Sequence, residues 1–103
     1  MIYRPLEKDE IYDKALPIFM KYKIKKAALF GSSARGEMRR GSDIDLIVEL
    51  DDTQSGLVFV EIKRKLENKL NRKVDLISYN SLAYSDLKES ILEDAKVIYE
   101  KAN

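Results

Sequence analysis

Apolar residues recur at helical spacing in three stretches of the chain. A spacing of three to four residues places such side chains along one side of a helix. The apolar positions are Ile11, Ala15, Ile18, Phe19 and Tyr22 in the first stretch, Phe59, Ile62, Leu66 and Leu70 in the second, and Leu87, Ile91, Ala95 and Ile98 in the third. We therefore predict helices over about residues 6–22, 57–70 and 81–100. Because proline is poorly tolerated inside a helix, we expect Pro17 to bend or divide the first one.

Three short runs between these helices have the pattern of β-strands. They cover residues 27–30, 44–50 and 74–78, and the second alternates between apolar and other residues. The order helix, strand, glycine-rich segment, strand, helix, strand, helix predicts an α/β (α+β) fold. We expect a small mixed β-sheet with helices packed on one face, and a single domain over residues 1–103, since the chain contains no repeat or linker-like segment.

Composition narrows the possible chemistry and location. The 103 residues include no histidine and no cysteine, which excludes imidazole bases, cysteine nucleophiles and zinc sites built from these ligands. Lys plus Arg is 19 and Asp plus Glu is 18, so direct nucleic-acid binding through bulk charge is not expected. No run approaches the roughly 20 apolar residues that span a bilayer, and the first residues lack the apolar core of a signal peptide. We expect a cytoplasmic protein without a membrane partner.

A glycine-dense segment follows the first strand. Gly31, Ser32, Ser33, Ala34, Arg35 and Gly36 stand where an apolar run ends. Glycine lets backbone amides approach a ligand closely, and a helix N-terminus with serine hydroxyls favours phosphate oxygens. The same residues could instead form an ordinary strand-to-helix turn in which serine caps the helix.

Two aspartates begin the second strand, and a third begins the last. Asp43 and Asp45 are two residues apart, so an extended backbone directs both carboxylates to one side. Oxygen ligands of this kind suit Mg²⁺ held together with substrate phosphates. If the strand with Asp75 lies beside the strand with Asp45, three carboxylates meet at one edge of the sheet, as two-metal phosphoryl or nucleotidyl transfer requires. The alternatives are a capping role for Asp43 and solvent-facing positions for Asp45 and Asp75.

The combined pattern resembles the signature of the DNA polymerase beta nucleotidyltransferase superfamily. It consists of Gly31, Ser32, Ala34, Arg35 and Gly36, then Ser42, Asp43, Asp45 and Leu46, with Asp75 at the position of the third carboxylate. The short chain looks more narrowly like a minimal nucleotidyltransferase (MNT), the antitoxin of HEPN–MNT toxin–antitoxin pairs.

The resemblance implies a role for each matching residue. Gly31 and Ser32 would hold the triphosphate of ATP, with Arg35 structural or facing a phosphate, while Asp43, Asp45 and Asp75 would be catalytic and bind two Mg²⁺ ions. The implied activity is transfer of AMP from ATP to a hydroxyl, a tyrosine, of a cognate HEPN RNase toxin. Such chemistry depends on positioning and charge neutralisation, and so does not require histidine or cysteine. Several bases could steer ATP to the acidic site, namely Arg35, Arg39, Arg40, Lys63, Arg64 and Lys65. For residues 63–65 a solvated helix surface is the favoured alternative.

Two other functions remain open from the sequence. The chain could neutralise a toxin by binding alone, although such a module would not require three converging acids. It could also transfer a nucleotide to a small molecule or an RNA, although members with those acceptors generally carry a further domain. Association with a second copy or with the partner is compatible with either.

Overall fold

The computed structural model describes residues 8–37, 42–50 and 56–101. In chain order its elements are α1 (Lys8–Lys21), β1 (Lys26–Leu29), α2 (Gly31–Arg35), β2 (Ile44–Glu49), α3 (Gly56–Leu70), β3 (Val74–Ser78), α4 (Tyr79–Leu82), α5 (Lys88–Asp94) and β4 (Lys96–Glu100). Within these described ranges, no helix is long and apolar enough to cross a membrane.

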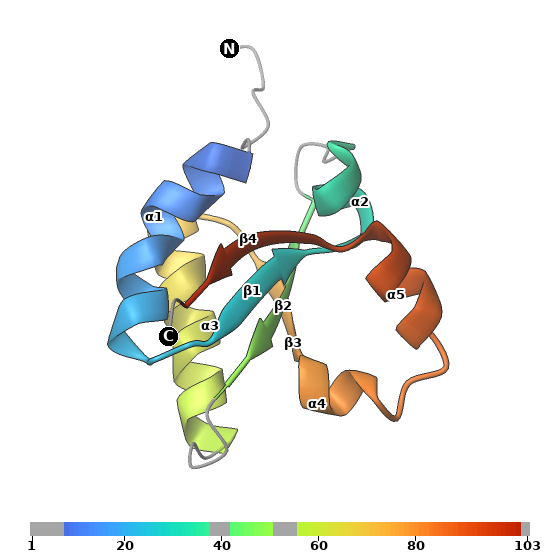
Figure 1. Ribbon diagram of the computed structural model, residues 1–103. Coiled ribbons are helices and arrows are strands. Elements are labelled where there is room, and N and C mark those ends of the chain that lie inside the picture. Colours follow the sequence, from blue (N-terminus) through green and yellow to red (C-terminus); the bar gives the residue numbers. More distant parts are fainter. Residues whose placement is uncertain (1–7, 38–41, 51–55, 102–103) are drawn as a thin grey trace.

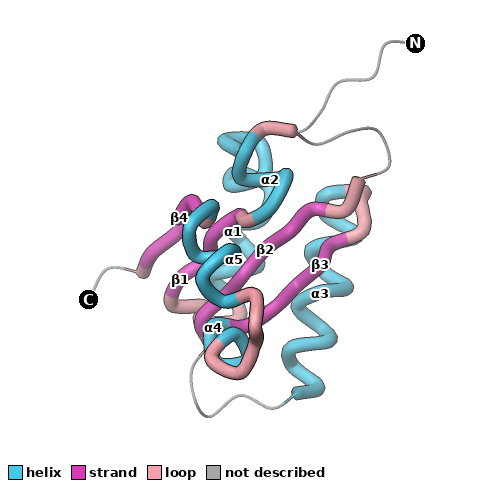
Figure 2. The backbone as a smooth tube through the Cα atoms, turned by 90° about the vertical axis from the view of Figure 1, so that its right-hand side faces the viewer, coloured by secondary structure: helices cyan, strands magenta, loops and turns pink. Residues whose placement is uncertain are grey.

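The four strands form one mixed sheet in the order β3-β2-β1-β4. Strand β1 runs antiparallel to both β2 and β4, whereas β2 and β3 are parallel. Parallel neighbours need a long connection, and the 15-residue helix α3 supplies it between β2 and β3. Figure 2 shows the strands side by side in this order. The predicted mixed sheet is confirmed.

The larger hydrophobic core lies between the sheet and the two long helices, α1 and α3, which pack together on one face (Figure 1). Alternate residues of β2 point into it, since side chains along a strand alternate between the two faces. Its fully buried members include Ile11, Phe19, Ile44, Leu46, Val48, Ile62 and Leu66. At one end of this layer the Oε2 atom of Glu67 accepts the Val74 backbone N–H at 2.9 Å, which joins α3 to the start of β3.

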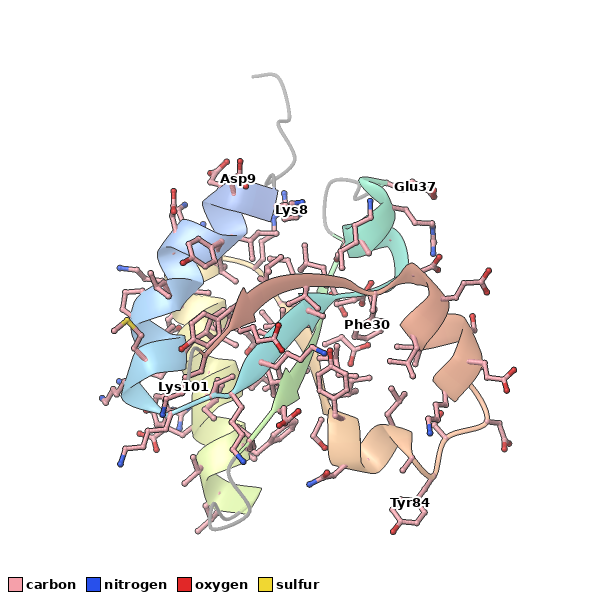
Figure 3. All side chains as sticks on the ribbon, in the orientation of Figure 1. Lys8, Asp9, Phe30, Glu37, Tyr84 and Lys101 are labelled. Carbon is pink, nitrogen blue, oxygen red and sulfur yellow. The ribbon has the colours of Figure 1, made fainter. Side chains whose placement is uncertain are left out.

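A smaller cluster covers the opposite face of the sheet beneath the short helices α4 and α5. It contains Ala28, Phe30, Ile47 and Leu82. Figure 2 shows α4 and α5 in front of the sheet and α3 behind it, and Figure 3 labels Phe30 on the side of the sheet that α5 covers. The expected packing on one face therefore describes α1 and α3, while α4 and α5 add a thinner second layer.

The sequence-based element predictions differ from the structure in two places. Pro17 does not divide the first helix, and α1 runs continuously through it. Pro17 and Asp13 are both on its exposed side, where water can bond the carbonyl that proline leaves without an N–H partner. The predicted helix over 81–100 is replaced by α4, α5 and strand β4. Ile98 and Tyr99 pack against the larger core, and the β1–β4 register shifts beside them.

Candidate active site

Asp45 and Asp75 are direct neighbours across the parallel strands β2 and β3. Their Cα atoms are register partners, each at the second position of its strand. Residues paired in this way point to the same face, here the face opposite α1 and α3. Asp45 is half-buried and Asp75 is exposed. The two strands thus lie side by side, which is the condition under which the sequence pattern brings these carboxylates together.

Asp43 directly precedes β2 and is exposed. Partial burial of Asp45, and then the charges of Asp75 and Asp43, raise the pKa of the Asp45 carboxyl above its ordinary value of 3.8. A hydrogen bond from the Ser33 backbone and the charge of Arg35 oppose this rise in the Asp45 pKa. Asp75 and Asp43 are therefore close enough to Asp45 to repel its charge, a repulsion that a bound cation relieves.

Gly31, the first residue of α2, lies against the Asp45 carboxylate. A Cβ at residue 31 would be 2.9 Å from Asp45 Oδ2, closer than real Cβ atoms come to other heavy atoms. Gly31 also has a φ of +56°, which residues other than glycine rarely adopt. Glycine is thus required here for its backbone conformation and for the space that Asp45 occupies.

The backbone of Asp45 is held by the turn that leads into α2. Its carbonyl accepts the Phe30 N–H at 3.1 Å, and its own N–H donates to Ser33 Oγ at 2.9 Å. Ser33 is 6% exposed and is the only buried polar side chain in the described parts of the chain. In the sequence Ser33 is one of two adjacent serines in the glycine-dense segment, and no local signal separates it from a turn residue or gives it a role of its own.

Ser32 and Arg35, the other predicted ligand-binding residues, lie on α2. Ser32 is half-buried, and its carbonyl accepts the Glu37 N–H at 2.9 Å. Arg35 donates from Nη1 to Asp94 Oδ2 at 2.6 Å and from Nε to Glu37 Oε1 at 3.2 Å. The guanidinium therefore links α2 to α5. Arg39 and Arg40, predicted to steer ATP, lie outside the described residues.

The three aspartates have the oxygen ligands that a hard cation prefers, but they are not spaced to enclose one by themselves. Carboxylate oxygens are the ligands that Mg²⁺ prefers in proteins. Asp45 and Asp75 supply them at paired positions of β2 and β3, and Asp43 supplies another just before β2. Among the described residues, no group of three or more acidic side chains is spaced to hold a metal ion. These carboxylates fit a site completed by substrate phosphates rather than one closed by protein ligands alone.

Comparison with known proteins identifies the family. Residues 13–103 match the profile described as polymerase beta, nucleotidyltransferase. The chain belongs to this family and is a nucleotidyltransferase, which confirms the resemblance seen in the sequence.

Individual relatives narrow the class further. A Methanocaldococcus jannaschii protein, provisionally named as the protein adenylyltransferase MJ0435, is 42% identical over 87 residues, covering 84% of this chain and 92% of its own. The protein adenylyltransferase MntA of Thermococcus cleftensis is 33% identical over 79 residues, 77% of each chain. A solved structure described as a toxin–antitoxin with AMP-PNP has a TM-score of 0.71 and 26% identity, over 87% of this chain and 73% of that one.

Proposed function

We propose that this chain is a Mg²⁺-dependent protein adenylyltransferase that transfers AMP from ATP to a tyrosine hydroxyl of a HEPN RNase toxin and thereby acts as its antitoxin. The observation that carries the proposal is the register pairing of Asp45 with Asp75. The Asp45 carboxylate of this pair lies against Gly31, where there is no room for a side chain at residue 31. Relatives named as protein adenylyltransferases support the reaction class. The toxin–antitoxin structure with AMP-PNP, an ATP analogue, supports the nucleotide and the kind of partner.

Each predicted residue has a role in the proposed reaction. Gly31 and Ser32 would hold the triphosphate, with Arg35 within electrostatic reach of Asp45. Asp43, Asp45 and Asp75 would hold Mg²⁺, which when bound neutralises phosphate charge. The tyrosine oxygen forms a bond to the α-phosphorus, and the bond from that phosphorus to the bridging oxygen breaks. Pyrophosphate leaves, and the hydroxyl proton passes to the exposed Asp75 carboxylate.

The test combines the purified chain with Mg-ATP and a purified HEPN toxin that is shown to bind it. We expect mass spectrometry to find an adenylate on a tyrosine of the partner. Asp45→Asn and Asp75→Asn should each abolish the modification, whereas Asp86→Asn, which removes an exposed acid outside the site, should not. Absence of the adenylate from a verified partner that binds the chain would refute the proposed reaction.

A second measurement separates catalysis from simple binding. The double variant Asp43→Ala with Asp45→Ala should still form the complex but should no longer protect cells from the toxin. Protection that persists with an intact complex would point to neutralisation by binding alone. An adenylate found on RNA or on a small molecule, and not on the partner, would instead identify another acceptor.

A further inference from the structure

The hydrogen-bond ladder between β1 and β2 lacks one backbone–backbone bond at Asp45. The antiparallel register pairs Leu29 with Leu46, and one step further it places Phe30 opposite Asp45. Residues in a hydrogen-bonded antiparallel pair exchange two backbone bonds, each donating its N–H to the other's carbonyl. Phe30 makes the first of these bonds, from its N–H to the Asp45 carbonyl at 3.1 Å.

The second bond cannot follow the same pattern, because the chain turns into α2 after Phe30. The Phe30 carbonyl accepts the Ala34 N–H at 3.2 Å, as the first turn of the helix requires. The Asp45 N–H is satisfied by Ser33 Oγ at 2.9 Å. A serine hydroxyl thus takes the place of a strand carbonyl and continues the ladder for one residue beyond β1.

Because Ser33 is buried, loss of this hydrogen bond would be energetically costly. The residue is 6% exposed, and a buried hydroxyl or amide that loses its partner keeps the full cost of its desolvation. Through this bond and the Phe30 bond, both backbone groups of Asp45 are tied to residues 30–33. The position of the Asp45 carboxylate relative to Gly31 and Ser32 therefore depends on Ser33.

We propose that Ser33 is a positioning residue that fixes Asp45 for cation binding; this inference rests on the proposed function, in which Asp45 binds the metal. Ser33 acts through the Asp45 backbone and is not itself a ligand. Partners that orient metal ligands typically contribute 10- to 100-fold to metal affinity. We expect loss of the Ser33 hydroxyl to weaken cation binding by about 10-fold or more.

Binding of Mn²⁺, a paramagnetic substitute for Mg²⁺, to the purified chain tests the inference without any activity measurement. Electron paramagnetic resonance gives the free ion during a titration. The informative pair is Ser33→Thr and Ser33→Val, because the two side chains have nearly the same shape and only threonine keeps the hydroxyl acceptor. Ser33→Ala removes the hydroxyl without adding volume. Ser85→Ala is the matched control, since Ser85 Oγ also accepts a backbone N–H, from Leu87 at 3.1 Å, but in an exposed loop.

We expect Ser33→Ala and Ser33→Val to bind Mn²⁺ about 10-fold or more weakly than the wild type, and Ser33→Thr and Ser85→Ala to stay within about twofold of it. If the alanine variant does not fold, as circular dichroism would reveal, the threonine and valine pair decides. Equal affinities in that pair would overturn the inference while leaving the proposed function intact. A wild-type chain that binds no Mn²⁺, with or without AMP-PNP, would overturn both.

Discussion

The Asp45 carboxylate occupies the space that a side chain at Gly31 would need. The Asp45 Oδ2 atom lies 2.9 Å from the point where a Cβ of residue 31 would be, and Gly31 holds a φ of +56°. Gly36 at the other end of α2 has a φ of +71°, but a Cβ there would meet nothing within 4 Å. The two glycines therefore separate the effect of backbone conformation from that of contact with the carboxylate.

Gly31→Ala and Gly36→Ala should each destabilise the fold by about 1 kcal/mol or more, because alanine is strained at positive φ. Only Gly31→Ala should also impair cation and nucleotide binding, since the end of the Asp45 side chain has to move away from the new methyl group. Denaturant unfolding and Mn²⁺ titration of both variants measure the two effects. Equal losses of binding in the two variants would show that the contact with Asp45 is unimportant.

Asp45 should make stability depend on pH in the metal-free protein. Because the Asp45 pKa is raised above 3.8 in the folded state, the folded chain holds this proton more tightly than the unfolded chain. Its contribution to the free energy of unfolding therefore falls as pH rises from 3.8 through the folded-state pKa. Asp45→Asn should remove this fall and be more stable than the wild type at neutral pH.

Denaturant unfolding at a series of pH values, in the presence of a chelator, compares Asp45→Asn with the wild type. Asp86→Asn serves as the control, because this acid is exposed and outside the site. A wild-type curve parallel to that of Asp45→Asn would contradict the assigned environment of Asp45. Added Mg²⁺ should reverse the stability order, because a cation stabilises the ionised carboxylate.

The bond from Arg35 to Asp94 should restrain α5. It spans 59 positions in sequence at 2.6 Å, and α5 has no fully buried residue of its own. Asp94→Asn should therefore increase hydrogen–deuterium exchange in residues 88–94, since elements with few buried contacts open locally. Glu37→Gln, which weakens the longer Arg35 contact of 3.2 Å, should leave exchange in α5 unchanged. Equal exchange in Asp94→Asn and the wild type would contradict this role.

Phe19 should be a principal support of the larger core. Its side chain is fully buried, and its ring centroid lies 5.2 Å from that of Tyr99 on β4. Phe19→Ala should lower the free energy of unfolding by about 3–5 kcal/mol, through lost burial and the cavity left behind. Tyr84→Ala should change it by less than about 0.5 kcal/mol, because Tyr84 is 92% exposed and projects from the loop after α4 in Figure 3.

Mg-ATP should stabilise the folded chain by binding to it. At a ligand concentration of about 100 times Kd the gain is about 2.7 kcal/mol, which for a domain of this size corresponds to a rise in Tm of roughly 10 °C or more. Thermal unfolding with and without Mg-ATP measures this shift. The Asp43→Ala and Asp45→Ala double variant should show almost none of it, and a full shift in that variant would argue against the assigned ligands.

The pairing of Asp45 with Asp75 could be anticipated from sequence because local pattern and topology agree there. Each aspartate stands near the start of a strongly apolar strand, and a helical stretch between the strands is long enough for a parallel crossover. The alternation in β2 also indicated which face the carboxylate would occupy. Local patterns were sufficient where strand, helix and strand follow one another directly.

The C-terminal strand and Ser33 could not be anticipated, and for the same physical reason. Leu87, Ile91, Ala95 and Ile98 have helical spacing. Residues 96–100 nevertheless form a strand, because they are stabilised more by backbone hydrogen bonds to the edge of β1 than by a continued helix. Ser33 takes its importance from Asp45, 12 positions away in sequence. In both cases the deciding partner is distant along the chain, so no window of local sequence contains it.

The register of β3 against β2 joins the stability of the protein to its chemistry. Val74 and Leu76 flank Asp75 and are buried at 2% and 7% exposure beneath α1 and α3. A slip of one residue would turn Asp75 into that apolar layer and bring Val74 and Leu76 out to solvent. The burial of two hydrophobic residues thus selects the strand register that pairs the two acids, because a sheet with a one-residue slip would lose part of its core.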